Sequence, residues 1–181
     1  MSIKNLIICC AVIILSSCAT KFKPEGNDFG KWQLPFAPVE VVQLLKGKHG
    51  DKDFVFQVAL SLQEERLSLI GLDAMGRRAF TVKWDKDGVH GEKAPWMPDQ
   101  LKGEHILYDL MLAYWPLESL NRPSDIIIEG EYKRLVTRDG ENRVTISRLD
   151  VHDRWQGRLI IENHHRSYRI EVQSQKIKGP K

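Results

Sequence analysis

The sequence predicts one domain of mainly β structure, in the α+β class, with antiparallel strands on both sides of a helical segment. Its length of 181 residues is typical of a single domain. From residue 53 the apolar residues alternate with period two, which indicates strands, and Asp139-Gly140 marks a strong hairpin turn. Between residues 95 and 120 the apolar spacing changes to three and four, which indicates a helix.

The strands expected before the helix share one apolar face. In the stretch 53–62, "DFVFQVALSL", every second side chain is large and apolar, and the stretches 66–72 and 78–84 continue this pattern. The loop "DAMGRR" separates the last two stretches, and "KDG" at 86–88 signals a turn. The side chains expected on the shared face include Phe54, Phe56, Val58, Phe80, Val82 and Trp84.

The main helix is predicted at about residues 98–114, and a short helix at about 116–121 follows it. The apolar stripe of the main helix includes Leu107, Leu110 and Met111. Another short helix is predicted within 39–45, because Val39, Val42 and Leu45 recur at roughly helical spacing. The strands expected after the helical segment lie in the stretches 130–137, 143–149, 155–163 and 167–177.

The beginning of the chain has the three parts of an export signal. Lys4 provides a positive start, and the apolar run 6–15 is shorter than the roughly 20 residues that a spanning helix needs. The order Leu15-Ser16-Ser17-Cys18 resembles the bacterial lipobox. This resemblance implies a diacylglycerol on the Cys18 thiol, cleavage before Cys18, and an N-acyl group such as palmitate. A plain secretory signal or an uncleaved anchor is the alternative.

These features divide the chain into a signal peptide (1–17), an acylated N-terminus and tether (18–37) and a folded domain (38–181). Cys9 and Cys10 leave with the signal, so acylated Cys18 leaves the mature chain without a free thiol or a disulfide. Ala19 follows Cys18, where an aspartate is associated with inner-membrane retention in enteric bacteria. We therefore expect an outer-membrane lipoprotein facing the periplasm, with no cofactor apart from its covalent lipid.

The sequence contains no strong signal for chemistry. The adjacent His164 and His165 would point to opposite faces of a strand, and the remaining histidines lack metal-ligand spacing. A Gly-x-Ser-x-Gly elbow and a phosphate-binding loop are both missing from the sequence. The formal net charge of +3 says little about partners, and export makes nucleic acid a poor partner. We expect a monomer that is not an enzyme and binds no metal.

Three stretches carry a resemblance to the outer-membrane lipoprotein receptor LolB and its soluble carrier LolA. "RLSLIGLDAMGRRAFTVKW" is similar to a hairpin of that family, "DQLKGEHILYDLMLAYWPLESL" to its helix and Pro-Leu segment, and "YKRLVTRDGENRVTIS" to the hairpin that follows. More narrowly, size and layout resemble an uncharacterised family of small LolB-like lipoproteins associated with gene clusters for aryl polyene-type lipids.

The resemblance implies an incomplete antiparallel β-barrel, a half-barrel with helices over its concave face, in which a cavity binds acyl chains. The cavity lining would be Phe54, Phe56, Val58, Phe80, Val82, Trp84, Leu107, Leu110 and Met111. Met75 stands where LolB places a loop residue that contacts the membrane during transfer, and Arg77 and Arg78 could engage lipid phosphates. From the pattern alone, a solid core without a cavity is the commoner outcome, and a tight turn with a partly exposed Met75 is the alternative for the loop.

Two functions follow from this reading. The first is a module that takes an acyl chain or a lipoprotein from a lipid or lipoprotein carrier and passes it to the membrane without covalent catalysis. The alternative is a structural or assembly lipoprotein of an envelope complex, with a solid core and no ligand.

Overall fold

The computed structural model describes residues 34–177, apart from residues 100, 121–124 and 151–152. The predicted signal peptide, Cys18 and most of the tether lie outside this part of the chain. Before the helix the strands are β1 (Val39–His49), β2 (Lys52–Leu62), β3 (Arg66–Leu72), β4 (Arg78–Asp85) and β5 (Gly88–Lys93). Helix α1 (Gly103–Tyr114), the short 3₁₀ helix η1 (Leu117–Ser119) and then β6 (Ile126–Glu129), β7 (Lys133–Arg138), β8 (Glu141–Arg148), β9 (Gly157–Asn163) and β10 (Tyr168–Lys176) follow.

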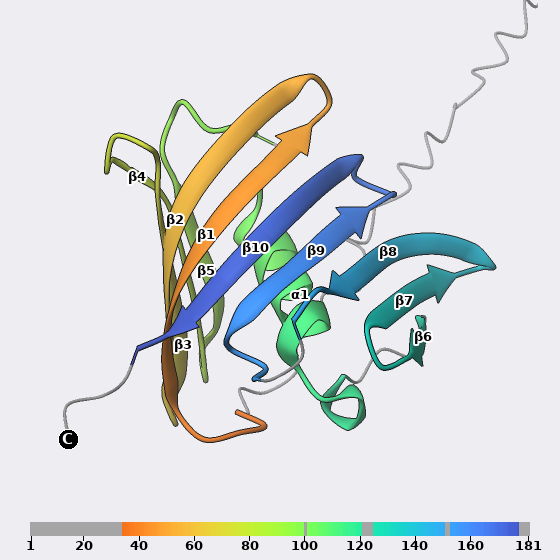
Figure 1. Cartoon of the computed structure of the whole chain (residues 1–181). Coiled ribbons are helices and arrows are strands. Elements are labelled where there is room, and N and C mark those ends of the chain that lie inside the picture. Colours follow the sequence, from red (N-terminus) through yellow and green to blue (C-terminus); the bar gives the residue numbers. More distant parts are fainter. Residues whose placement is uncertain (1–33, 100, 121–124, 151–152, 178–181) are drawn as a thin grey trace, which may run out of the picture.

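All ten strands form one antiparallel sheet in the order β5-β4-β3-β2-β1-β10-β9-β8-β7-β6. Each half of the sheet is a meander of neighbouring strands, and β1 pairs with β10 to join the halves. The sheet is strongly twisted and curves around α1, while β5 and β6 remain as its two edges (Figure 1). This arrangement confirms the predicted mainly β, incomplete barrel.

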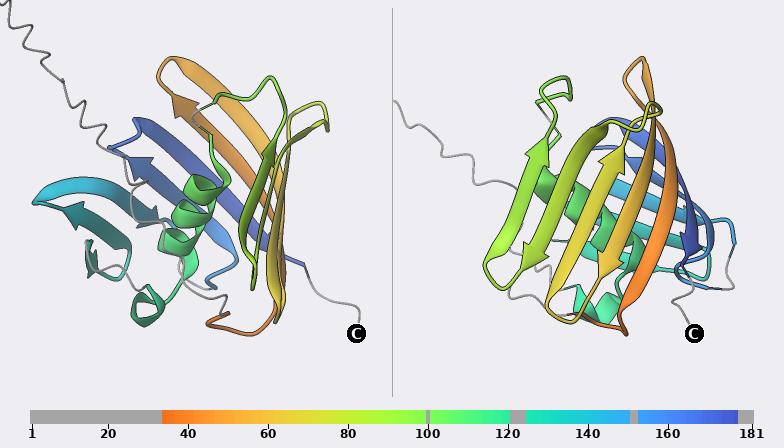
Figure 2. Two further views of the ribbon diagram at one scale, coloured as in Figure 1. Left: turned by 180° about the vertical axis from the view of Figure 1, so that it is seen from behind. Right: turned by 90° about the vertical axis from the view of Figure 1, so that its left-hand side faces the viewer.

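Helix α1 lies on the concave side of the sheet, between its two halves (Figure 2). All eight residues from Leu107 to Tyr114 are buried, so every face of this part of the helix contacts protein. A helix that is buried all around is part of a core and not a lid with one wet face. The core is continuous from β1–β4 through α1 to β7–β10.

The predicted helix within 39–45 is wrong, because these residues belong to β1. Val39, Val41 and Gln43 are buried on the concave face, while apolar Val42 and Leu44 lie on the other face. Apolar residues on both faces of the strand produced a spacing that resembles a helix. β-branched valines fit a pleated strand better than a helix, which agrees with the observed structure.

Other boundaries also differ from the prediction. Helix α1 begins at Gly103 and not near residue 98, because Lys102 is extended (φ −114°, ψ 145°). The helix predicted at 116–121 is the three-residue η1. The sequence reading identified only a turn before β5 and nothing at β6, and four strands were expected after the helix where the structure has five.

Candidate functional site

The loop between β3 and β4 is organised by the carboxylate of Asp73. Asp73 Oδ1 accepts hydrogen bonds from the backbone N–H groups of Met75 and Arg77, each at 2.9 Å, and Asp73 Oδ2 accepts one from Arg77 Nε at 2.8 Å. Partial burial opposes ionisation, but the bonds from Arg77 and Met75 prevail and lower the pKa of Asp73. Gly76 adopts φ +77°, which completes a tight turn with Met75 at its tip.

The Met75 side chain is 78% exposed, the largest exposure among the large apolar side chains of the described residues. Arg77 lies over the ring of Trp96 at 5.1 Å, so the loop after β5 stands beside the Met75 loop. Trp96 is 47% exposed, whereas the next residue, Met97, is buried and fixes the loop to the core. Sequence reasoning found Met75, Arg77 and Arg78 but missed Trp96, for which the only signal was an aromatic residue between prolines. We call Met75, Arg77, Arg78 and Trp96 the two-loop tip.

Three phenylalanine rings form a row on the concave face, at the end of the sheet where the loop between β3 and β4 lies. The ring centroids of Phe54 and Phe56 are 5.5 Å apart, and those of Phe56 and Phe80 are 5.6 Å apart with an edge-to-face angle of 82°. Phe54 and Phe56 are only half-buried, while Phe80 is buried. We call these three residues the phenylalanine row.

Two glycines lie beneath the phenylalanine row. A Cβ atom on Gly47 would lie 2.2 Å from Phe54 Cζ, and one on Gly71 would lie 2.3 Å from Phe80 Cε1. The two rings therefore occupy the space that side chains would take in an ordinary strand. If a ring rotates away, the glycine beneath it leaves a groove in the sheet surface.

The other predicted lining residues lie in the packed core. Val58, Val82, Trp84, Leu107, Leu110 and Met111 are all buried in the cluster between sheet and helix. Leu107 is 0% exposed, so the central part of the concavity is filled by the helix itself. The structure thus brings the predicted lining together, and only Phe54 and Phe56 keep a partly exposed surface.

A pocket of about 310 Å³ lies where β4 and β5 meet the beginning of α1. Its apolar wall is formed by Phe80, Val82 and Ile106, and charged side chains including Lys93 and Glu104 surround it. Phe80 belongs both to this pocket and to the phenylalanine row, so the two features are adjacent.

A buried polar network ties the middle of α1 to the β9–β10 hairpin. The Asp109 carboxylate accepts a short hydrogen bond from Tyr168 Oη and a long one, 3.4 Å, from Asn163 Nδ2, and Arg166 Nη1 lies 3.9 Å away. Burial raises the pKa of Asp109 to about 6, and the bonds and the nearby Arg166 only partly oppose this effect. Burial and the adjacent Asp109 charge also raise the pKa of Tyr168.

A second buried network lies further along α1. Gln43 Nε2 donates to Tyr114 Oη at 2.9 Å and to Ser174 Oγ at 3.0 Å, and the two hydroxyls lie 2.8 Å apart. Burial raises the pKa of Tyr114 to about 12, so its hydroxyl stays protonated. The network joins the central strand pair β1–β10 to the helix.

Three arginines satisfy the carbonyl groups at the end of α1. Arg134 Nη1 donates to Leu112 O at 2.6 Å and to Trp115 O at 3.0 Å, and Arg154 Nη1 donates to Tyr114 O at 2.7 Å. Arg148 Nη2 donates to Ala113 O. These four carbonyls have no partner within the helix, and the arginines provide the positive charge that a helix C-terminus favours. The helix itself has no basic residue in its last turn.

In the described part of the chain no group of three or more His, Cys, Asp or Glu residues is placed to hold a metal ion. No helix in these described ranges is both long and apolar enough to cross a membrane. The partly exposed phenylalanine row, the adjoining pocket and the two-loop tip therefore form the candidate site. Its chemistry is that of apolar contact beside cationic side chains.

An open antiparallel sheet wrapped around one buried helix defines the class of protein, an incomplete β-barrel. Residues 40–176 match the family described as "Protein of unknown function (DUF3261)", and the chain belongs to this family. Among solved structures, the chain is similar to a LolA superfamily protein from Nitrosomonas europaea, at 10% identity and a TM-score of 0.44, over 87% of this chain and 92% of that chain. A comparison with curated proteins found no match.

Proposed function

We propose that this chain is a lipoprotein of the outer membrane, facing the periplasm, that binds an acyl chain and passes it to the bilayer without covalent catalysis. The observation that carries the proposal is the phenylalanine row. Phe54 and Phe56 are partly exposed, and Phe54 and Phe80 lie over glycines, so rotation of these rings would open apolar space above the sheet. The ligand would be an acyl chain, belonging to a lipid or to a lipoprotein, as the sequence resemblance implies.

The position of the two-loop tip supports transfer. Phe80 pairs with Gly71, which is followed by Leu72 and then by the loop that carries Met75. An acyl chain that leaves the phenylalanine row therefore reaches the tip within one or two residues of strand. Exposed methionine and tryptophan side chains fit the bilayer interface, and Arg77 and Arg78 could each contribute about 1 kcal/mol near an anionic surface.

The proposed anchor at Cys18 leaves enough chain for the tip to reach the membrane. Residues 19–33 form a segment of 15 residues, which spans at most about 50 Å when extended. The 11 residues of β2 span about 37 Å. A domain tethered by the segment before β1 can therefore turn its far end, where Met75 lies, toward the same membrane.

Acyl-probe displacement tests the binding step. The Cys18→Ser protein, produced without its signal, should bind a fluorescent fatty acid, and lipid should be extractable from protein purified from its host. Phe54→Asp places a charge in the groove and should abolish probe binding, whereas Val55→Asp places the same charge on the opposite face of the same strand and should not. Absence of both extractable lipid and probe binding would refute the proposal.

The transfer step has its own test. Met75→Glu should leave probe binding unchanged but slow probe transfer to vesicles, because a charge at the tip opposes insertion. Lys86→Glu, in the turn at the other end of β4, is the control and should transfer normally. Mass spectrometry of the mature N-terminus should find S-diacylglycerol and N-acyl groups on Cys18, and Cys18→Ser should release the protein from membranes.

The filled concavity favours a second candidate function. Because α1 already occupies the centre of the half-barrel, the domain could instead be a closed structural or assembly module of an envelope complex. This alternative predicts a monomeric domain that binds no acyl probe but is recovered from membranes together with a defined protein complex.

A further inference from the structure

The three arginines at the end of α1 bring more positive charge than the helix end requires. Among the described residues, Arg134 Nη2 pairs with Glu129 Oε1 at 2.6 Å, and no other carboxylate lies within 4.0 Å of Arg134, Arg148 or Arg154. Three guanidinium groups thus face one carboxylate and a helix terminus equivalent to about half a negative charge. An excess of roughly one and a half positive charges remains.

The neighbouring guanidinium groups repel one another. The three groups are close, because they bind the consecutive carbonyls of residues 112–114. Burial lowers the pKa of Arg148, and the nearby charges of Arg134 and Arg154 lower it further. The four bonds to the helix carbonyls still leave N–H donors of Arg148 and Arg154 for other partners. The additional charges make an anion at this place favourable.

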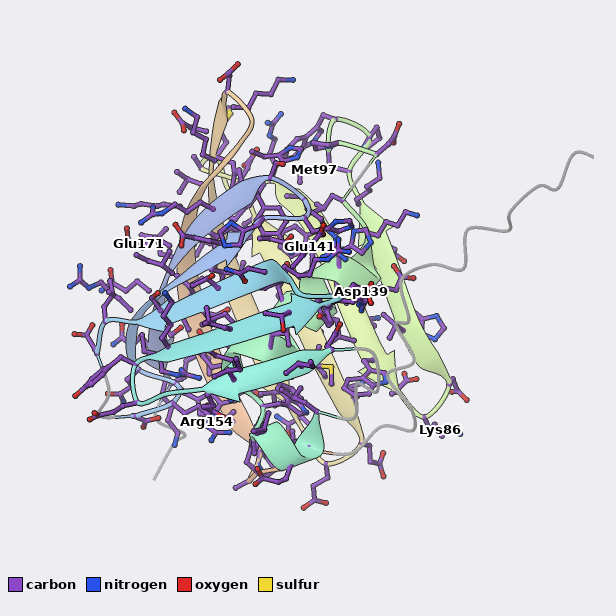
Figure 3. All side chains as sticks on the ribbon, turned by 90° about the vertical axis from the view of Figure 1, so that its right-hand side faces the viewer. Lys86, Met97, Asp139, Glu141, Arg154 and Glu171 are labelled. Carbon is purple, nitrogen blue, oxygen red and sulfur yellow. The ribbon has the colours of Figure 1, made fainter. Side chains whose placement is uncertain are left out.

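Two of the three arginines can reach a ligand from solvent. Arg134 is only 4% exposed and lies in the interior, whereas Arg148 is partly exposed and Arg154 is exposed. A guanidinium group carries five N–H donors, and the bonds from Arg148 and Arg154 to the helix each use one nitrogen. Arg154 lies on the opposite side of the domain from Met97, the residue that follows Trp96 (Figure 3).

Aromatic side chains hold this end of the domain in place. The rings of Tyr114 and Trp155 are stacked at 4.5 Å and 9°, and Phe36 contacts Trp155 and Trp115 edge-to-face at 5.2 and 5.1 Å. Arg154 lies over the Phe36 ring at 5.9 Å. The guanidinium positions are therefore set by packing, which reduces the entropy lost when a ligand binds.

We propose that Arg148 and Arg154, with Arg134 behind them, form a binding site for a phosphate group. Guanidinium groups bind phosphate through paired N–H donors, and two adjacent ones can hold several oxygens of the same group. The phosphate could be the head of a phospholipid or free phosphate. This site is separate from the phenylalanine row and does not depend on acyl binding.

Calorimetric titration of the Cys18→Ser protein tests this site with inorganic phosphate, dihexanoyl phosphatidic acid and dihexanoyl phosphatidylcholine. Arg154→Gln should weaken phosphatidic acid binding about tenfold, the value of one charged hydrogen bond. Arg158→Gln is the matched control, since Arg158 on β9 pairs with Asp150 at 3.5 Å and is outside the cluster. Arg148→Gln should weaken binding similarly, and thermal unfolding shows whether each variant is folded.

The outcomes separate the sources of the phosphate. Equal affinity for inorganic phosphate and phosphatidic acid supports a free-phosphate site, and preference for phosphatidic acid supports a lipid head. Failure of all three ligands to bind, or equal weakening by Arg154→Gln and Arg158→Gln, would overturn the proposal. Arg154→Gln should bind the fatty acid probe normally, so a failure of this site is distinguishable from a failure of the acyl-binding function.

Discussion

Replacement of the buried Asp109 by asparagine should remove a large pH dependence of stability. The carboxylate is held in α1 between Tyr168, Asn163 and Arg166, and its burial raises its pKa from 3.8 to about 6. Asparagine has the same shape and can still accept the hydrogen bond of Tyr168, but it does not ionise. Asp109→Asn therefore tests the cost of the buried charge with little change in packing.

The magnitude follows from the two pKa values. Each unit of difference between the folded-state and unfolded-state pKa corresponds to about 1.4 kcal/mol of stability. A pKa of about 6 in the folded state and 3.8 in the unfolded state therefore changes the free energy of unfolding by about 3 kcal/mol in total. Between these values the folded protein binds the extra proton, so the free energy of unfolding decreases as pH rises through this window and is constant above it. The contribution of Asp109 to stability is thus least favourable at neutral pH and above.

Urea unfolding of the wild type and Asp109→Asn at pH 4 and at pH 8 measures this effect. The stability difference between the two proteins should change by about 2 kcal/mol between these pH values, because the unfolded Asp109 is already more than half ionised at pH 4, and the variant should be relatively more stable at pH 8. Tyr168→Phe provides a second arm, because loss of its hydrogen bond should raise the pKa of Asp109 further and move the transition to higher pH. Parallel stability curves for the wild type and Asp109→Asn would refute the reasoning.

Three further substitutions test the packing of the helix and the groove. Arg134→Ala removes the donor to two helix carbonyls and leaves Glu129 without its ion pair, so urea unfolding should report a loss of about 3 kcal/mol. Leu107→Ala leaves a cavity at a fully buried position and should cost about 2–5 kcal/mol, whereas no loss would mean that α1 is not packed as described. Gly71→Ala should displace the Phe80 ring from the sheet, which should lower the free energy of unfolding by about 1–3 kcal/mol and change the affinity for the acyl probe. If neither quantity changes, the Phe80 ring does not need the space above Gly71.

The elements that could be predicted from sequence are those in which large apolar residues recur at one regular spacing. Strand β2 shows a clear alternation, and α1 shows a clear apolar stripe, so both were found. Strand β1 was misread because its two faces are both apolar. Strand β6 has only four residues, Ile126–Glu129, which is too short for an alternation to be visible.

Some residues of the candidate site could also be predicted from sequence, and others could not. The phenylalanine row and Met75 could be identified, because side-chain type and position in a hairpin carry the signal. The arginines at the end of α1 could not be identified, because their partners are backbone carbonyls, and every residue has one whatever its type. Arg134 lies on β7, Arg148 at the end of β8 and Arg154 in the turn before β9, and only the fold brings them together.

The pairing of β1 with β10 has a consequence for folding. Residues 41 and 176 face each other at the centre of the sheet, whereas every other strand pairs with a sequence neighbour. The two meanders can therefore form from local contacts, but their union requires closure of nearly the whole domain and is expected to be the slow step. Before β10 pairs with them, β1 and β9 each have an unpaired edge, which makes the partly folded chain prone to aggregation. Loss of β10 alone would thus separate the sheet into two halves.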